Sequence, residues 1–322
     1  MPEWLVERGI GETRAALIED GKIVEARIEL DGAVPAGSVI QARLANIGNN
    51  KRNAIAIGEG GVEYLLPRGA AGVTQGATVT IEVTRDKIPG AEPWKRPLAR
   101  VTDLPVEELP PLMERLGGQA RPFPGPTDAL GGSGWNDLID EARTGLVTFA
   151  GGELRISPTP AMTLIDVDGY LAPDELAVLG AGEAASAVRR LDIGGSIGID
   201  LPTVAGKAAR QAAAAAIDDR LSSPFERTAV NGFGFVQIVR PRAGPSLLET
   251  WSDRASAEAR TLLRLAAFEE PGAMRLVSHP AVSAILEANP DWLDALARQI
   301  GGAISLRPDA SLAMSGGHAE PA

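Results

Sequence analysis

Residues 161–221 alternate between short apolar stretches and longer amphipathic ones, and this order restricts the fold more than any other feature of the chain. AMTLIDVD is typical of a buried strand, residues 173–191 of a helix, SIGIDL of a second strand, and residues 204–221 of an alanine-rich helix. Gly194 and Gly195 mark the turn before the second strand. This order predicts a right-handed βαβ unit, whose two strands are parallel and usually neighbours.

Acidic residues interrupt both apolar strands near their carboxyl ends. Asp166 and Asp168 end the first strand, and Asp200 ends the second. Neighbouring strands lie about 4.8 Å apart, so we expect these carboxylates at one edge of the sheet, where they repel each other unless a cation lies between them. Magnesium binds one or two carboxylates and completes its shell with water and phosphate oxygens. Two interpretations fit the pattern: a magnesium site, or aspartates that cap the helices that follow.

The N-terminal part of the chain is rich in short strand patterns. Residues 3–30 contain two or three strands, with a hairpin turn at residues 19–22. Between residues 39 and 103, five β-rich segments alternate with glycine, asparagine and proline, a spacing that predicts a five-stranded barrel of the OB kind. Residues 103–145 contain so much proline and glycine that we interpret them as a connector with one short helix, WNDLIDEAR.

The remaining third predicts a mixture of helices and strands. The expected strands are residues 234–240, 303–308 and 311–315, and the expected helices are residues 256–270, 279–288 and 290–300. Residues 315–322 are expected to fray. The predicted fold class is therefore α+β and multidomain, with a β-rich N-terminal half, a domain that contains the βαβ unit, and a small C-terminal α/β domain.

Composition narrows the chemistry that the chain can perform. None of the 322 residues is cysteine, which excludes disulfides, thiolate zinc sites and cysteine nucleophiles. The two histidines, His279 before a proline and His318 in the tail, support neither a Ser-His-Asp triad nor a histidine metal cluster. Hydrolysis would therefore rest on carboxylates and a hard metal. The net charge of −11 requires any nucleic-acid site to be local.

Neither a membrane span nor a secretory signal is predicted. No stretch approaches the roughly 20 apolar residues that a membrane helix needs. The beginning, MPEWLVERGIGETR, carries acidic residues where a signal peptide has a basic lead and an apolar run. We therefore expect a cytoplasmic protein.

Gly206 and Lys207 open a helix after a strand, as in nucleotide-binding loops, but Ala208 replaces the serine or threonine of that motif.

Three ordered segments resemble the ribonuclease E/G family. They are TGLVTFAGGELRISPTPAMTLIDVDGY (residues 144–170), EAASAVRRLDIGGSIGIDL (183–201) and GFGFVQIVRPRAGPSLLE (232–249). The resemblance places Asp166 and Asp200 at the two metal-binding aspartates of the family, and Asp168 where the family has an asparagine that orients the metal-binding carboxylate. It implies an enzyme that uses Mg²⁺ to hydrolyse single-stranded RNA internally in RNA processing or decay.

The resemblance also implies contacts with RNA. Arg240 and Arg242 lie in its third segment and are candidates for phosphate contacts, with structural salt bridges as the alternative. Lys95 and Arg96 lie near the position of a basic RNA contact on the barrel of the family. Tyr64 is the aromatic residue that the middle barrel strands offer for base stacking, and a place in the core is the alternative.

The family divides the chain into five parts. These are an N-terminal ribonuclease-H-like segment (1–37), the OB-type barrel (38–102), a connector in place of the 5′ sensor (103–143), a catalytic deoxyribonuclease-I-like domain (144–250) and a small C-terminal domain (251–322). The lack of cysteine excludes the zinc link of the family and leaves open a homodimer formed without zinc. The competing interpretation is a catalytically weak or inactive RNA-binding homologue.

Overall fold

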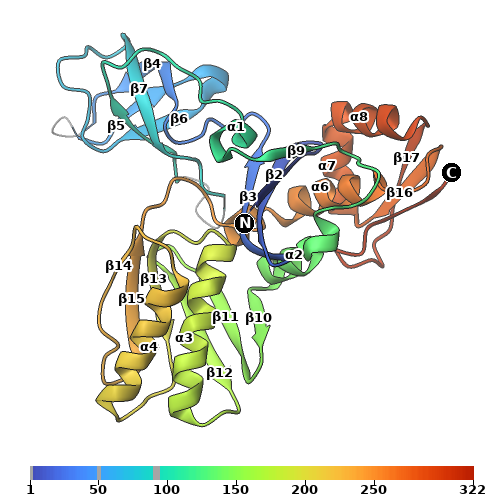
Figure 1. Ribbon diagram of the computed structural model, residues 1–322. Coiled ribbons are helices and arrows are strands. Elements are labelled where there is room, and N and C mark those ends of the chain that lie inside the picture. The colour runs from blue at the N-terminus through green and yellow to red at the C-terminus, as the bar shows by residue number, and fades with distance from the viewer. Residues whose placement is uncertain (1–2, 49–51, 90–94) are drawn as a thin grey trace. The chain divides into compact units, whose positions relative to one another are not determined.

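The computed structural model describes residues 3–48, 52–89 and 95–322, and its fold is mixed α+β (Figure 1). The chain forms two compact units, each made of separate stretches. The first unit comprises Met1–Asp31, Leu112–Arg143 and Thr250–Ala322, and the second comprises Gly32–Pro111 and Thr144–Glu249. In the described ranges, every helix is too short or too polar to cross a membrane.

A four-stranded sheet in the order β3-β2-β1-β9 begins the first unit. Its strands are β1 (Glu3–Arg8), β2 (Glu12–Glu19), β3 (Lys22–Leu30) and β9 (Gln119–Arg121). Asp20 and Gly21, with φ of 49° and 75°, form the tight turn between β2 and β3 that the sequence predicts. β9 pairs in parallel with β1, so the region predicted to be only a connector also supplies a strand.

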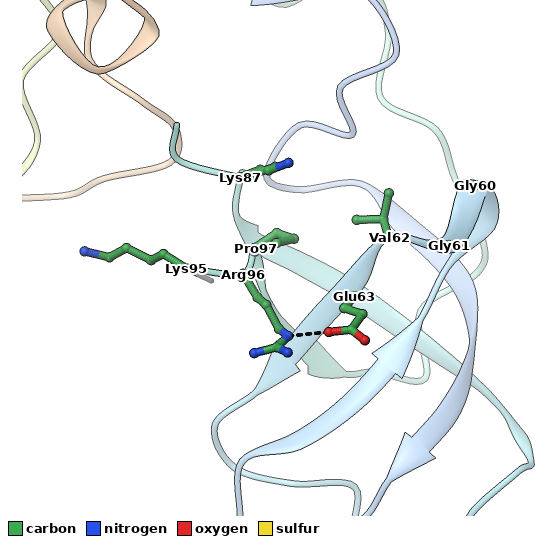
Figure 2. A pocket seen from close by; sticks show the side chains of 8 residues that line it. All are labelled: Gly60, Gly61, Val62, Glu63, Lys87, Lys95, Arg96 and Pro97. Atoms are coloured by element: carbon green, nitrogen blue, oxygen red, sulfur yellow. Dashed lines mark hydrogen bonds and ion pairs between the residues drawn. The ribbon is translucent and has the colours of Figure 1, made fainter. Parts of the chain in front are cut away.

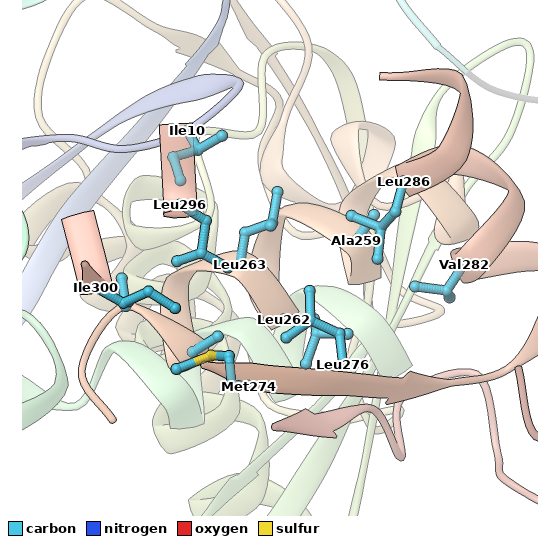
Figure 3. Packing of buried hydrophobic residues seen from close by; sticks show 12 residues of the cluster. Ile10, Ala259, Leu262, Leu263, Met274, Leu276, Val282, Leu286, Leu296 and Ile300 are labelled. Atoms are coloured by element: carbon cyan, nitrogen blue, oxygen red, sulfur yellow. The ribbon is translucent and has the colours of Figure 1, made fainter. Parts of the chain in front are cut away.

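The first unit also contains a three-stranded sheet and most of the α-helices that the structure describes. The helices are α1 (Leu112–Leu116), α2 (Trp135–Thr144), α6 (Arg254–Ala266), α7 (Pro280–Ala288) and α8 (Pro290–Ile300), and a 3₁₀ turn covers Gly131–Ser133. Strands β16 (Met274–Ser278), β17 (Ile304–Pro308) and β18 (His318–Pro321) lie in the order β17-β16-β18. Figure 3 shows Leu262 and Leu263 of α6 packed with apolar side chains of β16, α7 and α8.

Two sequence predictions for this region are wrong. Residues 311–315 form no strand. The tail that was expected to fray instead contains β18, which pairs with β16 in antiparallel fashion. The sequence does not predict β16, which pairs with β17 on one side and with β18 on the other. The tail forms a strand because β16 provides hydrogen-bonding partners for the backbone groups of β18.

The first unit buries a row of alternating charges. In order of contact, the residues are Arg260, Glu12, Arg14, Glu7, Arg264 and Asp128, with nitrogen–oxygen distances of 2.5–3.1 Å. Arg14 is 1% exposed and Arg264 is 2% exposed. Burial by itself raises the pKa of Glu12, but the charges of Arg14 and Arg260 and their hydrogen bonds outweigh burial, so this pKa is lowered. Three arginines and three carboxylates thus compensate one another and join β1 and β2 to α6.

A closed five-stranded barrel begins the second unit. Its strands, in the order β4-β5-β6-β8-β7, are β4 (Val39–Asn46), β5 (Ala54–Ile57), β6 (Glu63–Leu66), β7 (Thr78–Arg85) and β8 (Leu98–Val101), and a 3₁₀ turn covers Glu59–Gly61. β6 and β8 are parallel, whereas the other neighbours are antiparallel. The sequence prediction of a five-stranded barrel over this region is confirmed.

A six-stranded sheet completes the second unit. Its order is β10-β11-β12-β13-β15-β14, with bounds β10 (Leu146–Phe149), β11 (Gly152–Pro158), β12 (Thr163–Gly169), β13 (Gly195–Asp200), β14 (Glu226–Arg227) and β15 (Phe235–Arg240). Figure 1 shows α3 (Pro173–Arg190) and α4 (Lys207–Arg220) side by side on one face of this sheet. A short helix, α5 (Leu247–Thr250), follows. β12 and β13 are parallel, as the predicted βαβ unit requires.

Candidate active site

The two parallel strands of the βαβ unit place two carboxylates opposite each other. Asp166 of β12 is the register partner of Asp200, the last residue of β13. Neighbouring strands lie about 4.8 Å apart, and partners in register send their side chains from the same face. Asp168 follows on this face two residues after Asp166, and its antiparallel partner on β11 is Glu153. The local fold therefore places the three aspartates that the sequence singled out on one face of two neighbouring strands.

The two faces of the sheet have opposite chemistry. Ile165 and Val167 of β12 and Ile197 and Ile199 of β13 are at most 4% exposed and form the apolar face toward the helices. The three aspartates alternate with these residues or directly follow them, and all three are exposed. The carboxylates thus lie on the open face of the sheet within the second unit, where water and a substrate have access.

The aspartates do not cap the helices that follow the strands. The residue before α3 is Ala172 and the residue before α4 is Gly206, and neither provides a side-chain cap. In the described part of the chain, no hydrogen bond joins Asp166, Asp168 or Asp200 to these helix starts. The capping interpretation of the sequence pattern therefore has no support in the structure.

The carboxylates create an excess of negative charge. Partial burial raises the pKa of Asp166, and the nearby charges of Asp168 and Asp200 raise it further, whereas Arg155 of β11 lowers it by a smaller amount. Arg155 itself lies 2.5 Å from Glu153 in an ion pair. Within the described residues, none of the three aspartates forms an ion pair. A bound cation would therefore stabilise this edge of the sheet.

The donors present here suit a hard divalent cation. Carboxylate oxygens on neighbouring strands are ligands that magnesium accepts, and an open face leaves its other positions to water and substrate phosphate. Across the ranges that the structure describes, no group of three or more histidine, cysteine, aspartate or glutamate side chains converges as a metal cage. A metal at this edge would therefore rely on Asp166 and Asp200, with Asp168 close by.

Arg240 and Arg242 lie away from these carboxylates. On β15, Arg240 pairs with Gly195 at the beginning of β13, whereas Asp200 is at the end; five residues of strand separate them by roughly 16 Å at ~3.3 Å per residue. Arg240 donates to the carbonyl oxygens of Val188 and Ile193, and Arg242 forms an ion pair with Glu249. The structure therefore favours the salt-bridge alternative over phosphate contacts beside the metal-binding aspartates.

A basic pocket of about 340 Å³ lies on the barrel (Figure 2). Its walls are Gly60, Gly61, Val62 and Glu63 on one side and Lys87, Lys95, Arg96 and Pro97 on the other. Arg96 donates to Glu63 at 2.6 Å, which holds its guanidinium at the pocket wall. The sequence-predicted pair Lys95 and Arg96 is thus brought together with Lys87, and the pocket has an excess of positive charge.

Tyr64 does not offer a stacking surface. Its side chain is 2% exposed and packs in the barrel core with Leu66 and Ile81. Burial raises the pKa of its hydroxyl, and the charge of Asp86 adds to this effect. The core alternative therefore describes Tyr64, because side chains on this strand alternate and position 64 points inward.

Other residues at the edge with the aspartates were not singled out from the sequence. Glu153 and Arg155 lie on β11 beside β12, and Phe235 on β15 is the register partner of Asp200. The alternation of apolar and polar residues in LVTFAGGELRISP, with a Gly-Gly pair between two runs, could have predicted the hairpin of β10 and β11.

No family model matches this chain, and the search of curated proteins found no match either.

Proposed function

We propose that this chain is a magnesium-dependent endoribonuclease of the ribonuclease E/G type that hydrolyses single-stranded RNA in the cytoplasm. The observation that carries the proposal is the pairing of Asp166 with Asp200 on neighbouring parallel strands, exposed on an open face. Three further facts support it: the raised pKa of Asp166, the absence of an ion pair for these aspartates within the described residues, and the three sequence segments that resemble the family.

Each residue at this edge has a role in the proposed reaction. Asp166 and Asp200 would bind Mg²⁺ directly, and Asp168 would orient Asp166 and add negative charge on the same face. When bound, the ion supplies a Lewis acid for a phosphoryl oxygen and activates water at neutral pH. Arg155 limits the repulsion between the carboxylates, since its charge opposes the rise in the pKa of Asp166.

The barrel would hold the RNA backbone. Five-stranded barrels of the OB kind bind oligonucleotides on their second and third strands and at the connection between the fourth and fifth strands. Lys87, Lys95 and Arg96 lie in that last connection here. We infer that this pocket binds phosphate groups, which explains how a chain of net charge −11 contacts RNA locally.

A catalytically weak RNA-binding homologue is the second candidate. It is favoured by Asp168, which stands where the family has asparagine and whose charge raises the pKa of Asp166. An additional negative charge changes the number and order of ions that the edge binds. A homodimer formed without zinc is compatible with either function.

Cleavage of a labelled RNA separates the two candidates. A 5′-labelled AU-rich single strand is incubated with the full chain and Mg²⁺, with EDTA, and with the variants Asp166→Asn and Asp200→Asn. Asp219→Asn, an exposed aspartate of α4, is the matched control. Internal cuts that require Mg²⁺ and disappear in both site variants but not in the control support the enzyme. Binding without cleavage supports the second candidate.

A further inference from the structure

Two aromatic side chains stand in solvent at the sheet edge that carries the carboxylates. Tyr170 is 84% exposed and Phe233 is 81% exposed, the highest values for large apolar side chains among the described residues. Tyr170 directly follows β12, and Phe233 lies just before β15, whose first residue is opposite Asp200. Aromatic residues make up only 4% of the chain, and both of these forgo the free energy of burial.

Phe233 is presented by a turn with a fixed backbone. The side-chain oxygen of Asn231 accepts hydrogen bonds from the backbone N–H groups of Phe233 at 2.8 Å and Phe235 at 3.1 Å. The hydroxyl of Thr203 donates to the carbonyl oxygen of Phe233 at 3.1 Å. Gly234 has φ of +90°, and a Cβ there would lie 2.2 Å from a main-chain oxygen of the neighbouring segment. The exposure of the ring is therefore built into the local structure.

A third aromatic side chain, Phe235, lies on the open face beside the aspartates. A Cβ at Gly198 would lie 2.6 Å from Cζ of Phe235 and 3.1 Å from Cδ2 of Leu164, so these two side chains cover the glycine. Leu164 is 40% exposed. Leu164 precedes Asp166 by two residues on β12, and Phe235 is opposite Asp200. Phe235 and Leu164 thus form a small apolar platform next to the carboxylate pair.

We propose that Phe233 stacks on a nucleobase of single-stranded RNA whose adjacent phosphate lies at Asp166 and Asp200, and that the platform of Phe235 and Leu164 supports the neighbouring base. This inference rests on the proposed function and adds the groups that position its substrate. Gly234 alone separates Phe233 from Phe235, so the turn holds both aromatic residues at the end of β15 that lies opposite Asp200.

Stacking explains how an acidic edge can select a single strand. An aromatic ring binds the face of any base, and this contact needs no positive charge. The bases of a duplex are already stacked and have no free faces, so a duplex gains nothing from Phe233. The barrel pocket can bind the phosphates of either form, whereas the aromatic residues discriminate in favour of unpaired RNA.

The proposal is tested by comparing the binding of two strands of equal length and charge, one with bases and one without. Full-length protein carrying Asp166→Asn, which prevents cleavage, is titrated with a fluorescein-labelled ten-nucleotide oligouridylate and with an abasic strand of equal length and charge. We expect Phe233→Leu to raise the Kd for oligouridylate about tenfold and to leave the Kd for the abasic strand unchanged. Phe233→Trp should restore affinity. Val239→Ala, an exposed residue near the other end of β15, is the control and should bind normally.

Tryptophan fluorescence reports the contact directly. The additional emission of Phe233→Trp should be quenched by oligouridylate and not by the abasic strand. Unchanged binding by Phe233→Leu, or equal quenching by both strands, would overturn the proposal. A dimer of the wild type that Phe233→Leu dissociates in light scattering would also overturn it, because a second copy would then cover the ring.

Cleavage measured in parallel separates this inference from the proposed function. If the wild type cleaves RNA, Asp166→Asn does not, and Phe233→Leu changes neither KM nor Kd, the stacking inference fails and the enzyme stands. If no form cleaves RNA but Phe233→Leu weakens binding to oligouridylate alone, the stacking site stands and the enzyme fails. With both correct, Phe233→Leu raises KM about tenfold and leaves kcat within twofold.

Discussion

Arg14→Met tests the buried row of charges in the first unit. Arg14 lies 2.9 Å from Glu7 and 2.7 Å from Glu12, and its side chain is 2% exposed. Methionine keeps much of the volume but leaves three carboxylates to two arginines. Removal of one partner from a buried ion pair costs about 3–5 kcal/mol, because the remaining charge stays buried without compensation. We expect a loss of this size from the free energy of unfolding of the first unit.

Urea denaturation followed by tryptophan fluorescence measures this loss. Trp4, Trp135, Trp251 and Trp292 belong to the first unit, so the signal reports mainly on its unfolding. The control is Arg307→Met, which removes a partly exposed guanidinium 3.4 Å from Glu320 and should cost less than about 1 kcal/mol. An Arg14→Met protein that loses no more stability than this control would refute the argument that the row is held together by charge compensation.

The pH dependence supplies an independent check on the same residues. The pKa of Glu12 is lowered in the folded protein, so the stability that it contributes is present above its ordinary value of 4.5 and is lost as the pH falls through the lower folded value. Arg14→Met removes one of the two arginines that lower this pKa. The part of the stability that is lost on acidification should therefore be smaller in the variant and should end at higher pH, because the folded pKa of Glu12 then lies closer to 4.5. An identical pH profile in both proteins would contradict the assignment.

Three other outcomes are expected. Mg²⁺ at tenfold its Kd should stabilise the wild type by about 1.4 kcal/mol in thermal unfolding and should not stabilise Asp166→Asn; equal shifts would place the ion elsewhere. Gly198→Ala should cost about 1–3 kcal/mol in urea denaturation, because its Cβ would meet the ring of Phe235 at 2.6 Å, and an unchanged midpoint would mean that the ring moves freely. Lys87→Ala should weaken RNA binding in fluorescence anisotropy and reduce the slope of log K against log salt concentration by about one. Lys207→Ala, which removes a surface lysine outside the pocket, should show neither effect.

Sequence patterns predict the elements that are long or strongly periodic. The barrel strands and the βαβ unit are identified because glycine-rich turns separate clear alternations, and the positions of Asp166 and Asp200 follow from the parallel crossover. The three residues of β9 are too few to show a period, and β18 is stabilised by β16 rather than by its own sequence. A short stretch of sequence does not show such pairing, because the partner strand lies far away along the chain.

Side-chain roles are less predictable than strands. The sequence cannot show that Arg240 reaches the carbonyl oxygens of Val188 and Ile193, since those atoms meet it only after the crossover folds. Tyr64 was a candidate for stacking because it is aromatic and lies on a barrel strand, and its inward direction depends on register. The exposed Phe233 carries a detectable signal, because Asn-Gly-Phe-Gly is a turn sequence that leaves an aromatic residue at its tip.

The row of buried charges also sets an order of events during synthesis. Glu7 precedes its partner Arg264 by 257 residues. At about 5–20 residues per second, a ribosome needs roughly 13–50 s to add that interval. Throughout this time β1 and β2 carry carboxylates whose arginine partners on α6 do not yet exist, whereas the barrel strands are complete as soon as Val101 has been made. The N-terminal hairpin is thus the first part made and among the last to reach its native contacts. A protease or chaperone that binds nascent chains would therefore encounter this hairpin before it packs against α6.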